Sequence, residues 1–200
     1  MNNLGDYFGE LANRECRPRT RLVAAWSSKD IKSIRRCLES AFDRCKFDQR
    51  PLLLAKNVTG QAIGNRLASY FASQIGAQIR VFKVQSCAGQ GYPDRCLMRT
   101  ADKRRYALEL KATRRFEPKS TNRMSLTCSS RKLRRHFVPP INHLLVTALC
   151  RRDGNKVWIY DFRTDFLEPS TKVNVRLEVS VSHHLLAKST HASFWHSKRD

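Results

Sequence analysis

Long hydrophobic runs are absent from this sequence of 200 residues, and several other common signals are absent too. No run of about 18 apolar residues occurs, which is the length that a transmembrane helix needs. Residues 1–20, MNNLGDYFGELANRECRPRT, lack the basic and then apolar segments of a secretory signal. The seven cysteines include no CxxC pair, which argues against a zinc ribbon and a disulfide framework. We therefore expect reduced thiols in a cytoplasmic protein that does not span a membrane.

Acidic residues are scarce relative to basic ones. The sequence holds 38 Lys and Arg against 17 Asp and Glu, which gives a net charge of +21. A charge of this size destabilises a compact chain by self-repulsion unless a polyanion offsets it. The basic residues are not confined to one amphipathic helix, so a membrane surface is a poorer match than nucleic acid.

Helical periodicity is found in two segments of the N-terminal half. Residues 27–45 begin with a Ser/Asp capping signal and carry apolar residues at helical spacing, which predicts a first helix. Residues 57–76 predict a second helix, for which Gly76 is the expected C-cap. Gly60 and Gly64 lie four residues apart in it, which predicts a close approach of this helix to a sheet.

The apolar pattern then changes to a period of two, which is typical of strands. We expect strands at 78–85, 95–100, 105–112, 142–152, 156–162 and 173–182. A short basic helix stopped by two prolines is expected at 129–140, and a connection at 163–170. This order predicts an α/β fold with a mixed β-sheet flanked by helices. The length suits one domain over 1–200, with a basic N-terminal arm (about 1–26) and a C-terminal extension (about 183–200).

Two of the expected strands are close enough in the chain to form a hairpin. If strands 95–100 and 105–112 pair around a turn at 101–102, a simple antiparallel register places Asp94 opposite Glu109. Residues directly opposite each other on one face have Cβ atoms about 5 Å apart. The register therefore brings two carboxylates together.

Side-chain alternation adds a lysine to these carboxylates. In the strand YALELK, Glu109 and Lys111 share one face, and Leu108 and Leu110 point to the other. Such a group also fits ordinary cross-strand ion pairs. Its apolar surroundings, and the Gly-rich segment that leads into Asp94, favour a functional site instead.

The chemistry of this trio suits phosphodiester hydrolysis. Two adjacent carboxylates repel unless a cation lies between them, and Mg²⁺ prefers one or two carboxylates with waters and phosphate oxygens. Such an ion polarises a phosphate and lowers the pKa of a bound water. Lys111 is placed to orient that water and to stabilise charge developing on the phosphate.

The pair Pro93-Asp94, followed by Glu109-Leu110-Lys111, resembles the signature of the PD-(D/E)XK nuclease superfamily, whose fold is restriction-endonuclease-like. The core order of that fold is helix, three strands, helix, strand. Residues 57–76, 78–112, 129–138 and 142–152 resemble this order, about half of the chain.

This resemblance implies specific roles at the site. It implies that Asp94 and Glu109 bind Mg²⁺, with Mn²⁺ able to substitute, that the Leu110 carbonyl adds a ligand, and that Lys111 is the catalytic lysine. Many relatives carry a further acid on the helix before the sheet, whereas this helix offers Gln61 and Asn65. These two residues either act as auxiliary groups that hold a metal-bound water or a phosphate, or are simply exposed to solvent. Glu39, on the earlier helix, is a weaker candidate, so a second metal is in doubt.

Basic residues are concentrated around the predicted site. Residues 99–135 hold thirteen Lys or Arg and three Asp or Glu, a net charge of +10. This density predicts salt-dependent contacts with a duplex backbone, and Arg and Asn side chains also pair with base edges. The expected DNA-binding residues are Arg114, Arg115, Lys119, Asn122, Arg123, Arg131, Lys132, Arg134 and Arg135.

Together these features predict a type II restriction endonuclease, a Mg²⁺-dependent hydrolase that cuts phosphodiester bonds of double-stranded DNA at specific sequences. A small chain with one active site suits a homodimer in which each subunit cuts one strand. A homing endonuclease, a junction resolvase, a repair nickase and a non-catalytic DNA-binding protein remain open. The C-terminal tail packs on the core, contacts DNA or joins a dimer interface, and the sequence does not choose among these.

Overall fold

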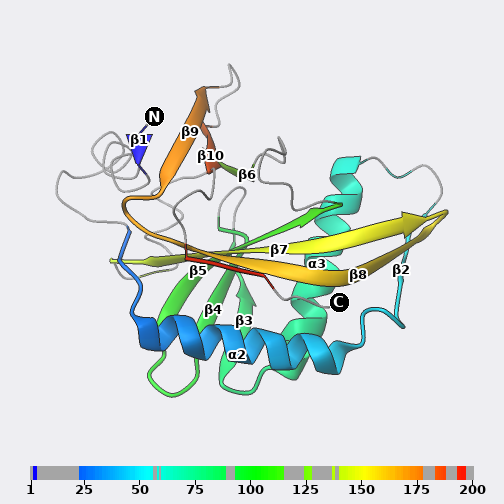
Figure 1. Cartoon of the computed structure of the whole chain (residues 1–200), viewed down its shortest axis with the longest axis horizontal. Helices are drawn as coiled ribbons and strands as arrows, with labels where there is room; N and C mark the ends of the chain where they lie inside the picture. The colour runs from blue at the N-terminus through cyan, green and yellow to red at the C-terminus, as the bar shows by residue number, and fades with distance from the viewer. Residues whose placement is uncertain are drawn as a thin grey trace.

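Two helices and a large mixed β-sheet make up most of the described chain, which has a mixed α/β fold (Figure 1). The computed structural model describes residues 2–3, 23–55, 58, 60–88, 93–114, 124–127, 137, 140–177, 183–187 and 193–196. None of the helices in these residues is both long and apolar enough to cross a membrane.

The first helix, α2 (Ser28–Cys45), agrees with the prediction for residues 27–45. The Ser27 side chain caps it by accepting a hydrogen bond of 3.1 Å from the backbone N–H of Asp30. Its buried side chains, among them Ile34, Leu38 and Phe42, lie three or four residues apart on one face. The helix ends at Lys46, whose backbone is left-handed with φ of 48°.

The second helix, α3 (Gly60–Gln78), continues two residues beyond Gly76, so the prediction of Gly76 as a C-cap is wrong. Gly76 instead lies where α3 packs on the sheet, because a Cβ added there would come within 3.4 Å of Val84 Cβ. The predicted close approach at Gly64 is also wrong, since a Cβ there would meet nothing within 4 Å. The lack of a side chain is therefore used at Gly76 and not at Gly64.

Strands form two sheets. The larger sheet has the order β11–β8–β7–β5–β4–β3, with β2 paired to β8, and the smaller has the order β1–β9–β10–β6. In the larger sheet β5 and β7 are parallel and every other pair is antiparallel. Its strands are β2 (Leu52–Leu53), β3 (Phe82–Ser86), β4 (Arg95–Arg99), β5 (Arg105–Thr113), β7 (Asn142–Asp153), β8 (Lys156–Leu167) and β11 (Ser193–His196). The smaller sheet consists of β1 (Asn2–Asn3), β6 (Met124–Thr127), β9 (Lys172–Leu177) and β10 (His183–Ala187).

Several strand predictions need correction. The strand expected at 78–85 begins only at Phe82, because α3 occupies the chain up to Gln78. The connection expected at 163–170 is wrong over its first five residues, which continue β8 and pair with β7. The helix expected at 129–140 lies outside the described residues except for 137 and 140. In the tail, β11 pairs with β8 and β10 joins the smaller sheet, pairings that the sequence did not predict.

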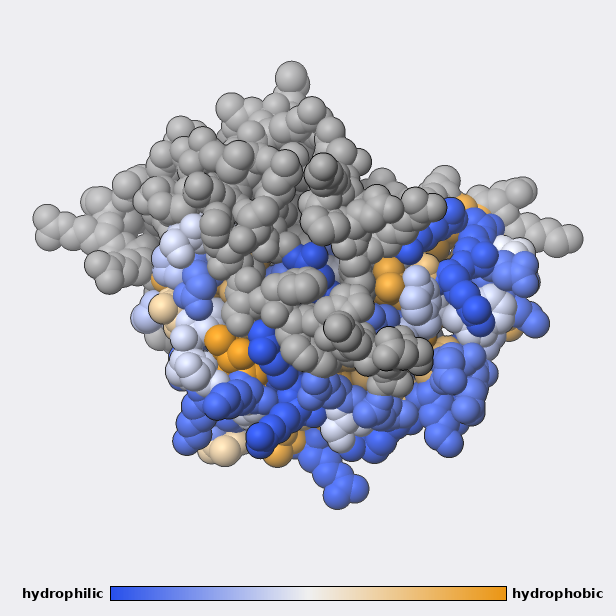
Figure 2. Space-filling model, in the orientation of Figure 1, coloured by the Kyte–Doolittle hydropathy of each residue, from blue (hydrophilic) through white to orange (hydrophobic). Residues whose placement is uncertain are grey.

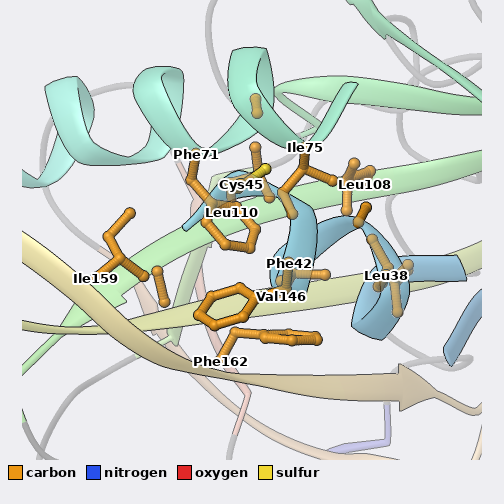
Figure 3. Packing of buried hydrophobic residues seen from close by; sticks show 14 of the residues in the cluster. Leu38, Phe42, Cys45, Phe71, Ile75, Leu108, Leu110, Val146, Ile159 and Phe162 are labelled. Atoms are coloured by element: carbon orange, nitrogen blue, oxygen red, sulfur yellow. The ribbon is translucent and has the colours of Figure 1, made fainter. Parts of the chain in front are cut away.

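The core lies between the larger sheet and both helices, which cover the same sheet face. Figure 3 shows Phe42 of α2 and Phe71 of α3 packed with Leu110, Val146 and Phe162 of the strands. The ring centroids of Phe42 and Phe162 are 4.9 Å apart. Burial of these large aromatic and aliphatic groups is the main force that holds the helices on the sheet.

Trp26 anchors the chain just before α2 to distant strands. Its ring stacks on Tyr106 with centroids 5.3 Å apart. Its indole N–H donates to the carbonyl of His143 at 3.2 Å, and its backbone N–H donates to Glu168 Oε1 at 3.2 Å. The entry into α2 is thus fixed by residues more than a hundred positions later in the chain.

The cysteines of the described residues are all free thiols. Cys45, Cys87, Cys96 and Cys150 are buried and Cys37 is half-buried. Burial raises the pKa of Cys45 and of Cys96 to about 11. These thiols are therefore packing groups, as the sequence predicted for several of the cysteines.

Candidate active site

The β4–β5 hairpin adopts the register that the sequence predicts. Arg95 pairs with Leu108, so the next position in the same register joins Asp94 and Glu109. The backbone N–H of Asp94 donates to Glu109 Oε2 at 3.2 Å. The two acids thus meet at the point where the ladder between β4 and β5 ends.

Lys111 completes this cluster from the same face of β5. Its Nζ forms an ion pair with Glu109 Oε1. Leu108 and Leu110 belong to the core on the opposite face, which confirms the predicted alternation. The Glu109 residue is only 3% exposed, whereas the Lys111 side chain is 34% exposed. The ammonium is therefore the solvent-facing end of the pair and the carboxylate is its buried end.

The electrostatic state of Glu109 is set mainly by burial. The pKa of its carboxyl is raised to about 7: desolvation raises it most, the nearby Lys111 ammonium lowers it, and the Asp94 charge raises it. The Lys111 charge therefore does not offset the combined effect of burial and of the Asp94 charge on the pKa of Glu109. An additional cation next to Glu109 would favour its ionised form.

These residues fit a single divalent cation. The donors are the carboxylates of Asp94 and Glu109 and the carbonyl of Leu110, all hard oxygen ligands of the kind that Mg²⁺ prefers. Across the part of the chain that the structure describes, no group of three or more His, Cys, Asp or Glu could hold a metal. Glu39 therefore does not form such a group with the two acids.

Of the two auxiliary residues predicted on α3, the structure describes the side chain of Asn65 and not that of Gln61. The Asn65 side chain is exposed and forms no hydrogen bond there with Asp94, Glu109 or Lys111. The helix itself packs on the sheet face opposite to Glu109. The Gln61 side chain lies outside the described residues. A role for either residue stays a prediction.

Of the predicted DNA-binding residues, the structure describes one. Arg114 is exposed and follows directly after β5, three residues from Lys111. The others lie outside the described residues, namely Arg115, Lys119, Asn122, Arg123, Arg131, Lys132, Arg134 and Arg135.

Thr147 is a neighbour of the site that the sequence analysis missed. It lies on β7 directly beside Lys111 in the parallel ladder, so both side chains point to the same face. The residue is 5% exposed, and its Oγ1 has no hydrogen-bond partner within the described residues. The sequence carries no signal for this neighbour, because the pairing joins strands that are distant in the chain.

No model of a known protein family matches this chain, and no curated protein matches its sequence. The geometry of the site therefore carries the functional proposal.

Proposed function

We propose that this protein is a Mg²⁺-dependent endonuclease that cuts double-stranded DNA, with a restriction-endonuclease-like core and the PD-(D/E)XK site Asp94, Glu109 and Lys111. The observation that carries the proposal is the register of the β4–β5 hairpin, which places Asp94 opposite Glu109. The Glu109 carboxylate accepts from the Asp94 backbone N–H and pairs with the Lys111 ammonium. We further propose a type II restriction enzyme that acts as a homodimer, with one site for each strand.

The arrangement of the core supports the proposal. The helix α3 is followed by the antiparallel strands β3, β4 and β5, and β7 lies parallel to β5. The resemblance implies the order helix, three strands, helix, strand, and these elements agree with it apart from the second helix, which lies almost entirely outside the described residues. The net charge of +21 supports a polyanionic substrate.

The reaction would be hydrolysis of one phosphodiester bond. A water oxygen attacks phosphorus, the bond from phosphorus to one sugar oxygen breaks, and that oxygen takes a proton while the attacking water loses one. The Lys111 ammonium, which reaches solvent, would stabilise the negative charge that grows on the phosphate oxygens. Glu109 would hold this ammonium in place from its buried position, and Asp94 would add a second negative charge to the site.

The same residues would hold the metal ion. Asp94, Glu109 and the Leu110 carbonyl would bind Mg²⁺, which when bound polarises the phosphate and favours deprotonation of water. The raised pKa of Glu109 makes this binding dependent on pH, because the carboxyl must lose its proton to bind a cation.

Cleavage of plasmid and phage DNA is the direct test. We expect discrete fragments with Mg²⁺, none with EDTA, and none with the Lys111→Ala variant. The matched control is Lys83→Ala, because Lys83 is an exposed lysine on the same sheet that lies two strands away on β3. The control should cut as the wild type does.

Two other outcomes would change the proposal. Nicks or a smear in place of discrete fragments would replace the restriction enzyme by a resolvase or a repair nuclease. DNA that is bound but left intact in both Mg²⁺ and Mn²⁺, over varied unmodified sequences, would overturn the catalytic role. In that case the cluster would be an ion pair within a hairpin of a DNA-binding protein.

A further inference from the structure

A second basic region, made of residues that the sequence did not single out for DNA binding, lies on α2. An open groove of about 1120 Å³ runs between α2 and the segment that joins α3 to β3. Among the residues that the structure describes, no acidic residue lines it and five cationic residues do, namely Lys29, Lys32, Arg36, Arg44 and Arg80. Figure 2 shows mainly hydrophilic residues along the lower edge of the molecule, where Figure 1 places α2.

The cationic residues that α2 contributes to the groove lie along one face of this helix. Its residues on α2 are spaced three or four apart, and the acids of the helix, Asp30, Glu39 and Asp43, do not line the groove. Within the described residues, Lys29, Lys32 and Arg36 form no ion pair. Like charges three or four residues apart destabilise a helix, and cations near its N-terminus oppose the helix dipole. This arrangement is unfavourable in the free chain and becomes favourable when an anion lies in the groove.

One of the groove cations is held in place by its neighbours. The Arg44 guanidinium donates to Ser40 Oγ at 2.5 Å and to the carbonyl of Gln78 at 2.8 Å. Gln78 is the last residue of α3, so Arg44 links the two helices that border the groove. A guanidinium fixed in this way loses little conformational entropy when it binds a phosphate.

We propose that this groove, lined by Lys29, Lys32, Arg36, Arg44 and Arg80, binds the phosphate backbone of duplex DNA outside the cleavage site. The choice of duplex DNA as the polyanion rests on the proposed function. No aromatic side chain of the described ranges lines the groove, which disfavours stacking of single-stranded bases. In those same ranges Val81 is its only large apolar residue, and an anionic membrane surface would be matched better by several inserted apolar side chains.

Binding to DNA in EDTA tests the groove without any cleavage. The variant Lys29→Gln/Lys32→Gln/Arg36→Gln removes three exposed charges. We expect its affinity for a mixed-sequence duplex to fall at least about tenfold at an ionic strength of about 0.1 M. The slope of log affinity against log salt should become smaller by about 2 to 3, since each lost phosphate contact reduces it by about 1. Thermal unfolding should show that the variant remains folded.

The matched control is Lys46→Gln/Arg50→Gln/Lys156→Gln, which removes the same charge from exposed residues that do not line the groove. It should keep most of the affinity and the slope. Equal losses in both variants would overturn the proposal, because binding would then follow net charge alone. So would groove-dependent binding to phosphatidylserine vesicles, or to single strands, that exceeds duplex binding. A chain that binds duplex DNA through the groove but never cuts it supports this inference and overturns the nuclease.

Discussion

The two ends of the β4–β5 hairpin both carry charged residues, but in different proportions. At the turn end, Arg99 Nη1 lies 2.7 Å from Asp30 Oδ1 and Arg99 Nη2 lies 2.5 Å from Asp102 Oδ2. Arg104 Nη1 lies 3.1 Å from Asp30 Oδ2, and its Nη2 donates to Asn142 Oδ1 at 2.9 Å. Two arginines therefore face two acids, and together they tie the turn to the start of α2.

At the other end, two acids face one lysine. Glu109 is paired with Lys111, and Asp94 adds a second carboxylate beside it. The balanced end connects parts of the fold, whereas the unbalanced end has a buried carboxyl whose pKa burial raises to about 7. Two carboxylates beside one lysine favour the binding of a cation, as the proposed function requires, whereas equal numbers of acids and arginines suit a structural ion-pair network.

The largest expected effect is a difference in the rate of DNA cleavage between variants at the two ends of the hairpin. Lys111→Ala should lower the rate of cleavage by about 10² to 10³, the usual loss when one group that stabilises transition-state charge is removed. Arg99→Ala, at the turn end, should leave that rate nearly unchanged. Single-turnover cleavage by both variants measures this difference. Equal losses would show that the hairpin acts only through its stability.

The next variant, Asp30→Ala, removes the buried acid at the turn end of the hairpin. Asp30→Ala leaves Arg99 and Arg104 without their shared partner and should lower the free energy of unfolding by about 2 kcal/mol. The loss is smaller than for a fully buried pair, because both arginines reach solvent. Urea unfolding measures it, and cleavage by the folded variant should persist. A variant as stable as the wild type would mean that this network contributes nothing to stability.

A third prediction concerns pH at the unbalanced end. Because the pKa of Glu109 is raised from 4.5 to about 7, the folded chain holds its proton longer than the unfolded chain does. Without metal, stability should therefore fall as pH rises from about 4.5 to about 7, by roughly 3 kcal/mol, and stay level above that. Glu109→Gln should remove this fall, and Mg²⁺ should oppose it in the wild type. Urea unfolding at several pH values is the measurement, and an unchanged profile in the variant would contradict the prediction.

The smallest expected effect is at Asp102, whose side chain is half-exposed. Solvent and salt screen its pair with Arg99, so Asp102→Ala should change the thermal midpoint much less than Asp30→Ala does. The difference from the wild type should shrink further in high salt. A loss as large as that of Asp30→Ala would show that the turn, rather than the link to α2, stabilises this end.

Local features of this chain could be predicted from the sequence, and contacts between distant elements could not. The meeting of Asp94 and Glu109 was predictable because a short hairpin leaves few registers, and strand alternation then places Lys111. The position of Thr147 beside Lys111 was not predictable, because it depends on the parallel pairing of β5 with β7. Gly76 was misread as a cap because only the packed structure brings Val84 to it. The groove on α2 likewise requires the end of α3 as its second wall.

The contacts of Trp26 also set the order in which the chain can complete its structure. Its backbone N–H pairs with Glu168, 142 positions later, and its indole N–H pairs with the carbonyl of His143. During synthesis from the N-terminus, α2 emerges long before either partner exists. The start of α2 is therefore anchored only after His143 of β7 and Glu168, which follows β8, have been synthesised. Closing so long a loop is slow, so docking of Trp26 belongs to the late phase of folding.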